Sequence, residues 1–201
     1  MQKVGNFSNS RGFTIVELLI VIVIIGILAA LVIVAYNGIT DRANNTQTES
    51  AMGAWRKAMI QYATDRGSYP ISSNACFNET NVTGCWPTSS ASTTLNNALR
   101  PYLGNQNPLP AASLQSLPNT WGADRVGGGF YYNPSATLDG VAYPYYLAYN
   151  LKGKVRCNIS GILSMTAWPV MSTTAPTNGR SSDDGANMTF CILALPDPTK
   201  L

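Results

Sequence analysis

A long uncharged stretch near the N-terminus is the feature that most constrains this chain. Leu18 to Tyr36 are 19 consecutive residues without a charge, and no polar group occurs among them before the Tyr36 hydroxyl. As an α-helix this stretch is roughly 28 Å long, which is enough to span the hydrocarbon core of a bilayer. Lys3 and Arg11 precede it, and basic residues flanking a membrane helix keep that end in the cytoplasm. The sequence therefore predicts a single pass through the cytoplasmic membrane, with the rest of the chain outside.

A carboxylate stands at the beginning of this stretch. Glu17 directly precedes the uncharged run, and a carboxylate in hydrocarbon is costly unless a partner meets it. We therefore expect a positive group close to Glu17. The alternative is an ordinary cleavable signal peptide, for which Ala29, Ala30 and Ala35 offer weak cleavage sites. That alternative gives no reason for the carboxylate.

The sequence turns polar after Tyr36 but stays compatible with a helix to about Arg66. Within this polar segment, apolar residues recur at steps of three and four: Ala51, Met52, Trp55, Ala58, Met59, Tyr62 and Ala63. This spacing predicts an amphipathic helix with one face on a core. Gly67 and Pro70 end the helix, and the Asn37-Gly38 pair is where we expect a bend or local melting.

The remainder of the chain predicts loops followed by strands. Residues 67–128 are rich in Ser, Thr, Asn, Pro and Gly, with a short helical piece expected at Thr94–Leu103. The strand signals are an aromatic run at Phe130–Tyr132, a turn at Asp139-Gly140, a hairpin of Tyr145–Leu151 with Lys154–Ile159 around Lys152-Gly153, and a last strand at Met188–Leu195. These elements predict an α+β fold, with a long N-terminal helix packed on a small antiparallel sheet.

Four cysteines are present, at positions Cys76, Cys85, Cys157 and Cys191. An even number of cysteines in an exported chain favours disulfides over a metal site, and the C-x-x-C spacing of zinc sites does not occur. Four cysteines allow three pairings. Closeness in sequence favours Cys76–Cys85, which leaves Cys157–Cys191. We expect Cys157 on a middle strand and Cys191 on the last, so that this bridge would tie the C-terminal segment to the sheet.

Composition argues against catalysis, cofactors and nucleic-acid binding. The chain has no histidine, the commonest general base and metal ligand, and its net charge is only +3. Asp183 and Asp184 are adjacent, so their side chains diverge, and residues 181–187 lack the alternating ligand order of a calcium loop. The tyrosines after residue 130 are expected to pack on the sheet. We expect neither an enzyme nor a metal-binding or cofactor-binding protein.

The run Arg11-Gly12-Phe13-Thr14-Ile15-Val16-Glu17-Leu18-Leu19 resembles the prepilin cleavage motif of type IV pilins and pseudopilins. Gly26, Ala29, Ala30 and Tyr36 also match the helix pattern of that family, and the segment Tyr62–Pro70 is similar to its helix exit. The resemblance implies a type IV pilin fold. It implies that a membrane peptidase cuts between Gly12 and Phe13, that Phe13 is then N-methylated, and that Glu17 is the fifth residue of the mature chain.

The resemblance also implies a division of the chain: a leader at 1–12, a transmembrane and assembly helix at 13–36, its amphipathic continuation at 37–66, and an extracytoplasmic domain at 67–201. The expected function is a structural subunit of a pilus-like filament. The alternatives are a pseudopilin of a type II secretion system and a membrane-anchored extracytoplasmic binding protein or enzyme. The implied partners are other copies of the chain, a prepilin peptidase, an inner-membrane assembly platform and, before assembly, membrane lipid.

Overall fold

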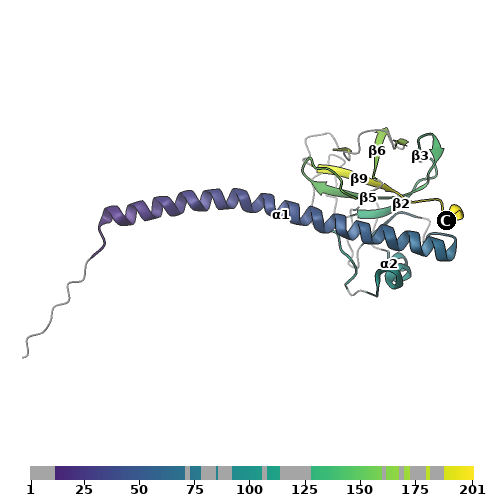
Figure 1. Cartoon of the computed structure of the whole chain (residues 1–201), viewed down its shortest axis with the longest axis horizontal. Coiled ribbons are helices and arrows are strands. Elements are labelled where there is room, and N and C mark those ends of the chain that lie inside the picture. The colour runs from purple at the N-terminus through teal and green to yellow at the C-terminus, as the bar shows by residue number, and fades with distance from the viewer. Residues whose placement is uncertain are drawn as a thin grey trace, which may run out of the picture. The chain divides into compact units, whose positions relative to one another are not determined.

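The structure is a computed structural model. It describes residues 12–70, 73–77, 85, 92–105, 108–113, 128–159, 162–167, 170–172, 180–181 and 188–201. The chain divides into two compact units between Thr40 and Asp41. The first unit contains the N-terminal part of helix α1 (Ile15–Arg66), and the second contains every other helix and strand described (Figure 1).

Helix α1 begins and ends where local chemistry allows it. The N–H of Gly67 donates to the carbonyl of Ala63 at 2.8 Å, and Gly67 has a φ of 71°, a left-handed conformation that glycine adopts without strain. The helix therefore ends at Arg66, as the sequence predicts. It continues through Asn37 and Gly38, so the local melting expected there does not occur.

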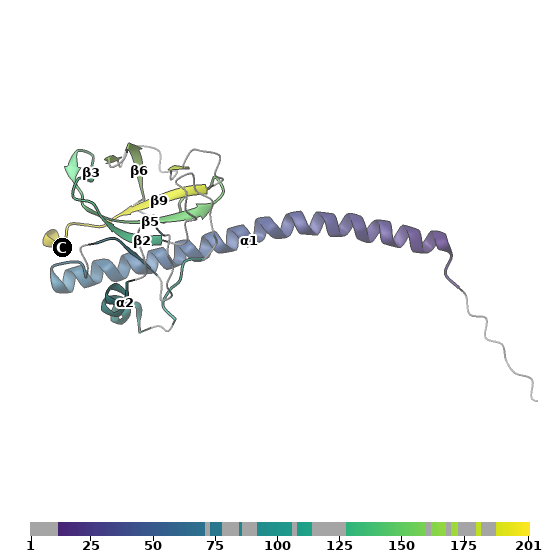
Figure 2. The same ribbon diagram turned by 180° about the vertical axis from the view of Figure 1, so that it is seen from behind.

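The second unit is a sheet with a helix on one face. Besides α1, its helices are α2 (Thr93–Leu99), η1 (Arg100–Leu103) and η2 (Pro198–Lys200). Its strands are β1 (Ala75–Cys76), β2 (Gly128–Tyr132), β3 (Thr137–Leu138), β4 (Val141–Ala142), β5 (Tyr145–Lys152), β6 (Ile162–Ala167), β7 (Val170–Ser172), β8 (Arg180–Ser181) and β9 (Met188–Ala194). Figures 1 and 2 show the C-terminal half of α1 lying between the sheet and α2.

Among the described residues the strand order is β1-β2-β5-β9-β6-β7-β3-β4, with β8 also paired to β9. The central pairs are antiparallel, and the pairing of β3 with β7 is parallel. The turn at Asp139 and Gly140 has positive φ at both residues, as the tight β3–β4 hairpin requires. The structure thus has the predicted α+β architecture, a long helix with a largely antiparallel sheet.

The apolar stripe of α1 packs on the inner face of the sheet. Met52, Trp55, Ala58, Met59 and Ala63 are fully buried, as the periodicity predicts. They share a core with side chains from β2, β5, β9 and α2: Phe130, Leu147, Tyr149, Leu151, Cys191, Leu193, Leu95 and Leu99. The helical piece expected at Thr94–Leu103 is present as α2 and η1.

The outer face of the central strands is also buried. Tyr131, Tyr146, Ala148, Phe190 and Ile192 form a second apolar cluster there. Because alternate residues of a strand point to opposite faces, β5 is buried along nearly its whole length. The central strands therefore resemble core strands, with neither face left to solvent.

The prediction that Lys154–Ile159 is a strand paired with β5 is wrong. Residues 154–159 are not a strand, because β9 occupies the edge of β5 that such a strand would need, and β2 occupies the other edge. After Gly153, with a φ of 85°, the chain leaves the sheet and is held by the N–H of Val155, which donates to the Thr189 hydroxyl at 3.0 Å. Cys157 thus lies on this connecting segment and not on a middle strand.

Three polar side chains of α1, spaced by four residues, attach the helix to the last residue of β5 and to the segment that follows it. Asn45 accepts from the N–H of Lys152 and donates to its carbonyl, both at 2.9 Å. Asp41 forms an ion pair with the Lys152 ammonium at 2.9 Å, and Glu49 accepts from the backbone and side-chain N–H groups of Asn158 at 2.6 and 3.1 Å. We call Asp41, Asn45 and Glu49 the polar clasp. It holds the two helical turns that precede the apolar stripe.

Candidate processing and assembly segment

The bond between Gly12 and Phe13 lies in extended chain just before α1. Both residues are outside the helix, and the Phe13 side chain is 87% exposed. Among the described residues, and apart from the chain neighbours of Gly12, no atom lies within 4 Å of the position that a Cβ on Gly12 would take. Nothing within the described chain therefore covers this bond, so a protease could reach it. Lys3 and Arg11, which the topology prediction uses, lie outside the described residues.

Glu17 closes a capping box at the start of α1. Its carboxylate accepts hydrogen bonds from the N–H and the hydroxyl of Thr14, both at 2.8 Å. In return, the N–H of Glu17 donates to the Thr14 hydroxyl at 3.2 Å. These bonds satisfy N–H groups that the first turn of a helix leaves unpaired, and the negative charge lies at the positive end of the helix dipole. The Thr-x-x-Glu spacing carried this signal, but the sequence analysis missed it.

The helix that follows presents apolar side chains all round. From Leu18 to Ile33 the large apolar side chains are between 50% and 65% exposed. By its length and composition this part of α1 could cross a membrane, and none of its most apolar window is buried by the protein. So large an apolar surface requires a cover of lipid or of other protein.

The four cysteines form two disulfides in the second unit. Cys76 is joined to Cys85 and Cys157 to Cys191, with Cα–Cα distances of 5.6 and 6.0 Å. The first bridge fastens β1, and the Tyr131 hydroxyl donates to the Cys85 carbonyl at 2.8 Å beside it. The second bridge fastens the connecting segment after β5 to β9. A disulfide of this loop length typically contributes about 2–4 kcal/mol.

The remaining candidate residues fall into two groups. Asp183 and Asp184, and with them most of the segment 181–187, lie outside the described residues. The tyrosines of the sheet pack within the protein: Tyr131 stacks on Tyr146 with ring centroids 5.5 Å apart, and the Tyr145 ring lies 4.9 Å from that of Tyr69, which follows α1. Burial raises the pKa of Tyr146 and, together with the nearby charge of Glu49, the pKa of Tyr149. These rings therefore serve the core and do not form an exposed stacking surface.

The N-terminal part of the chain matches a known family model. A family model described as the prokaryotic N-terminal methylation motif matches residues 7–33. The chain carries this motif. The match includes the Gly12–Phe13 bond, the capping residue Glu17 and most of the uncovered apolar helix. The motif therefore coincides with the segment that the geometry sets apart from the folded domain.

Curated relatives are pilins and a secretion protein. The chain is 38% identical over 65 residues to fimbrial protein EcpC of Eikenella corrodens, a match of 32% of this chain and 42% of that protein. It is 40% identical over 62 residues to type II secretion system core protein G of Klebsiella michiganensis, covering 31% and 44% of the two chains. It is 38% identical over 60 residues to type IV major pilin protein PilE1 of Neisseria gonorrhoeae, covering 30% and 36%.

The similarity is limited in extent. The chain spans less than half the length of these curated relatives. No solved structure matches it. The methylation motif at residues 7–33, together with the long N-terminal helix and the antiparallel sheet, is consistent with the α+β fold of type IV pilins.

Proposed function

We propose that this chain is the precursor of a subunit of a type IV pilus-like filament, cut between Gly12 and Phe13 and assembled through residues 13–36. One observation carries the proposal. An exposed peptide bond inside the methylation motif is followed at once by a helix whose apolar side chains the protein leaves uncovered. Processing needs access to the bond, and assembly needs an apolar helix to bury.

The helix has two successive environments in this proposal. In the precursor its side chains are dissolved in lipid, with the leader on the cytoplasmic side and the disulfide-bonded domain outside. In the filament the same side chains pack against the helices of neighbouring subunits. Gly26, Ala29 and Ala30 are small enough to let helices approach closely, and without the leader the chain has 11 basic against 10 acidic side chains, so copies repel weakly.

Glu17 links cleavage to assembly. In the uncut chain its carboxylate is bonded only to neutral groups of Thr14 among the contacts described. Cleavage would create a positive amino group on Phe13, about one helical turn away. Pairing of that group with Glu17 of a neighbouring subunit would neutralise both charges as the helices leave the lipid. Removing the carboxylate should thus slow assembly while leaving cleavage largely intact.

The direct test is the N-terminus of the protein isolated from its host. Intact-mass spectrometry should find a chain that begins at Phe13 and carries one added methyl group. Gly12→Val should block the cut, because a larger side chain is not expected to fit the peptidase, whereas the control Gly26→Ala should be cut normally. A chain that still begins at Met1, or one trimmed near Ala35, would refute the proposal.

A second candidate is a pseudopilin of a type II secretion system. Its specific support is the similarity to core protein G, which is as high as the similarity to the pilins. Both candidates require the same cleavage and the same partners, namely a prepilin peptidase and an inner-membrane assembly platform. Two experiments separate them. If the chain is a pilin, an antibody to it labels long surface filaments in electron microscopy. If it is a pseudopilin, its deletion abolishes secretion of an exported enzyme.

A further inference from the structure

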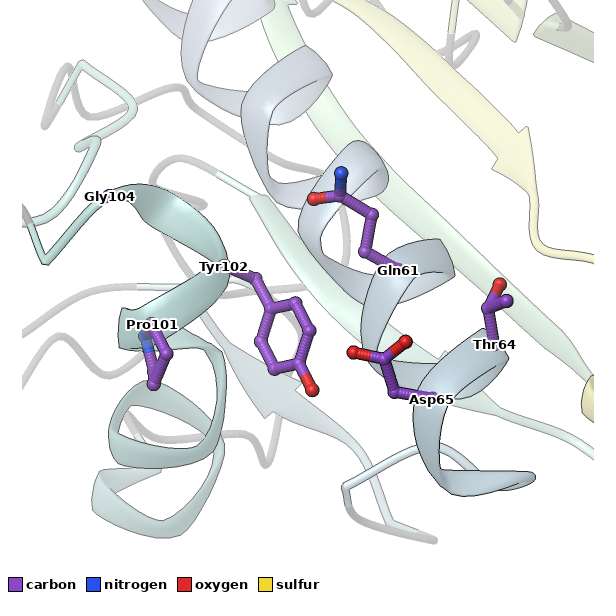
Figure 3. Close-up of a pocket in the computed structure, with 6 residues that line it drawn as sticks. All are labelled: Gln61, Thr64, Asp65, Pro101, Tyr102 and Gly104. Atoms are coloured by element: carbon purple, nitrogen blue, oxygen red, sulfur yellow. The ribbon is translucent and has the colours of Figure 1, made fainter.

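A groove of about 530 Å³ lies in the second unit between the end of α1 and η1. It is lined by Gln61, Thr64, Asp65, Pro101, Tyr102 and Gly104. Figure 3 shows the two walls: the Tyr102 and Pro101 rings come from η1, and Gln61 and Asp65 come from α1, with the Asp65 carboxylate pointing toward the Tyr102 ring. The volume is within the range of small-molecule sites.

The aromatic wall is held in place by the fold. The Tyr102 ring packs edge-on against Tyr62 of α1, with centroids 5.6 Å apart and an interplanar angle of 66°. Next to it, Leu103 is buried in the core. The turn that ends η1 is closed by the N–H of Gly104, which bonds to the carbonyls of Arg100 and Pro101. The ring is thus fixed before any ligand arrives, which lowers the entropy cost of binding.

The opposite wall offers hydrogen-bonding groups of several kinds. The Asp65 carboxylate accepts only, and the Gln61 amide both donates and accepts. The Thr64 hydroxyl already donates to the Ile60 carbonyl at 2.8 Å, so it is left as an acceptor. A ligand that matches both walls has a flat apolar face for the Tyr102 ring and hydroxyl donors along its edge.

We propose that this groove binds the end of a neutral saccharide. The C–H face of a pyranose ring would lie on Tyr102, and its hydroxyls would donate to Asp65 and Gln61. The groove is larger than a single ammonium or guanidinium group needs and carries one carboxylate, so a sugar fills it better than a lysine or arginine side chain does. Its openness to solvent lets a longer glycan continue outward.

The expected affinity of one site is low. A ligand of monosaccharide size in an open groove supports a Kd on the order of 1 mM. If the chain forms a filament, as proposed above, the same groove recurs along it, and simultaneous binding of a glycan-coated surface would multiply the affinity. Only this gain from repetition rests on the proposed function, since the groove lies within one chain.

The test uses the full-length chain in a zwitterionic detergent, because detergents with sugar headgroups would compete. Methyl β-glucoside, methyl β-galactoside, N-acetylglucosamine and lactose are titrated in turn, and backbone amide resonances are followed by two-dimensional NMR. We expect at least one of these sugars to cause saturable shifts at Gln61, Tyr102 and Gly104. N-acetyl-lysinamide serves as the cationic comparison and should cause none.

Variants distinguish this groove from other surfaces. Tyr102→Ala removes the ring and should weaken binding at least about tenfold, and Gln61→Ala, an exposed change that does not touch the core, should weaken it several-fold. Lys57→Ala, one turn earlier on α1 and outside the groove, should leave the Kd unchanged. Asp65→Asn retains the shape and one acceptor oxygen, so it should weaken the binding of a sugar only modestly.

Three results would overturn the proposal. The first is that no sugar causes saturable shifts at concentrations on the order of 100 mM. The second is that sugar binding is unchanged by both Gln61→Ala and Tyr102→Ala, and the third is that N-acetyl-lysinamide saturates the groove and no sugar does. Gln61→Ala keeps the test decisive if Tyr102→Ala fails to fold. N-terminal processing and filament formation of Gln61→Ala should be normal, so failure of this proposal would not count against the proposed function.

Discussion

Glu17 has two physical roles that can be separated. In the uncut chain it is the third residue of α1 and completes a capping box with Thr14, which fixes where the helix begins. In the proposed filament its charge meets the amino group of Phe13. The first role needs only a hydrogen-bond acceptor, whereas the second needs a negative charge.

Glu17→Gln and Thr14→Val therefore form a matched pair of variants. Gln at this position still accepts the bonds of a capping box, but it carries no charge. Because an unpaired ammonium in an apolar bundle is costly, we expect Glu17→Gln to reduce filament yield at least about tenfold, as Glu17→Ala would. Thr14→Val removes the cap and should cost the helix start about 0.5–2 kcal/mol, with a smaller effect on filaments. Filament counts by electron microscopy, alongside the mass of the N-terminus, measure both. Normal filaments from Glu17→Gln would mean that capping, not charge, is what assembly requires.

Gly129 is a residue at which adding a single methyl group should lower the stability of the fold. A Cβ at this position would lie 2.7 Å from the backbone carbonyl of Ala75 and 2.9 Å from the Cys85 sulfur. Neither neighbour can move freely, since one is paired in β1 and the other is in a disulfide. We expect Gly129→Ala to lower the free energy of unfolding by about 1–3 kcal/mol.

Gly53→Ala is the control for that change, because Gly53 is inside α1 and, apart from the neighbouring helix backbone, no atom of the described residues lies within 4 Å of its Cβ position. Alanine is favoured over glycine there by about 0.5–1 kcal/mol, so this variant should be as stable as the parent or more so. Thermal unfolding followed by circular dichroism measures both. Equal stability of Gly129→Ala and the parent would show that β1 is not held as closely as the structure places it.

At the scale of elements, the sequence predicted the features that follow from burial, but it did not predict those that depend on individual contacts. The stripe around Trp55 could be recognised because a helix that covers a core must repeat apolar residues every three or four positions. The polar clasp also has a four-residue spacing, but exposed polar residues on a helix need no partner, so nothing marked Asn45 as bound. The strand predicted after Gly153 has residues that favour strands. It is excluded because β5 pairs with β9, which is distant in sequence.

The polar clasp predicts a measurable contribution from Asn45. Asn45→Ala removes both hydrogen bonds to Lys152 and leaves the N–H and carbonyl of that residue without these partners. We expect a loss of about 1–3 kcal/mol in the free energy of unfolding. The control is Thr46→Ala. Its exposed hydroxyl donates to the Arg42 carbonyl within the same helix, so the change should alter stability by less than about 0.5 kcal/mol. Urea unfolding of the two variants measures the difference. Equal midpoints for both would show that the clasp contributes nothing to stability.

At the scale of the whole molecule, the central strands β2, β5 and β9 of the second unit are buried on both faces, and tyrosines pack on each face. Tyr69 and Tyr149 lie on the side of α1, and Tyr146 lies on the other side. The sequence predicted that the tyrosines pack on a sheet, but it could not assign them to faces, because the register of β5 against β2 and β9 depends on distant residues. Their common property is that ionisation inside the protein is unfavourable.

Alkaline solution should therefore unfold the second unit in a way that reports these rings. Burial raises the pKa of Tyr69, Tyr146 and Tyr149 above the ordinary value of 10.0. Stability is fully present below pH 10, and it falls as the pH rises further, because the unfolded chain releases tyrosine protons that the folded chain must keep. For a fully buried ring such as Tyr149 the loss is about 1.4 kcal/mol per pH unit. Tyrosinate absorbance and circular dichroism, recorded in one titration, should show a late group of tyrosines that ionises only as the secondary structure is lost.

Two phenylalanine variants make this prediction specific. Tyr149→Phe removes a buried hydroxyl that has no hydrogen-bond partner within the described chain, so it should cost little at neutral pH and should move the alkaline midpoint upward. Tyr69→Phe also removes an ionisable group, but it loses the bond from the Tyr69 hydroxyl to the Pro196 carbonyl at 2.7 Å, so its stability at neutral pH should fall by about 1 kcal/mol. The contrast separates burial from hydrogen bonding as the source of the alkaline transition. If every tyrosine ionised near pH 10 with the circular dichroism unchanged, the burial of the central strands on both faces would be wrong, and so would the placement of α1 on their inner face.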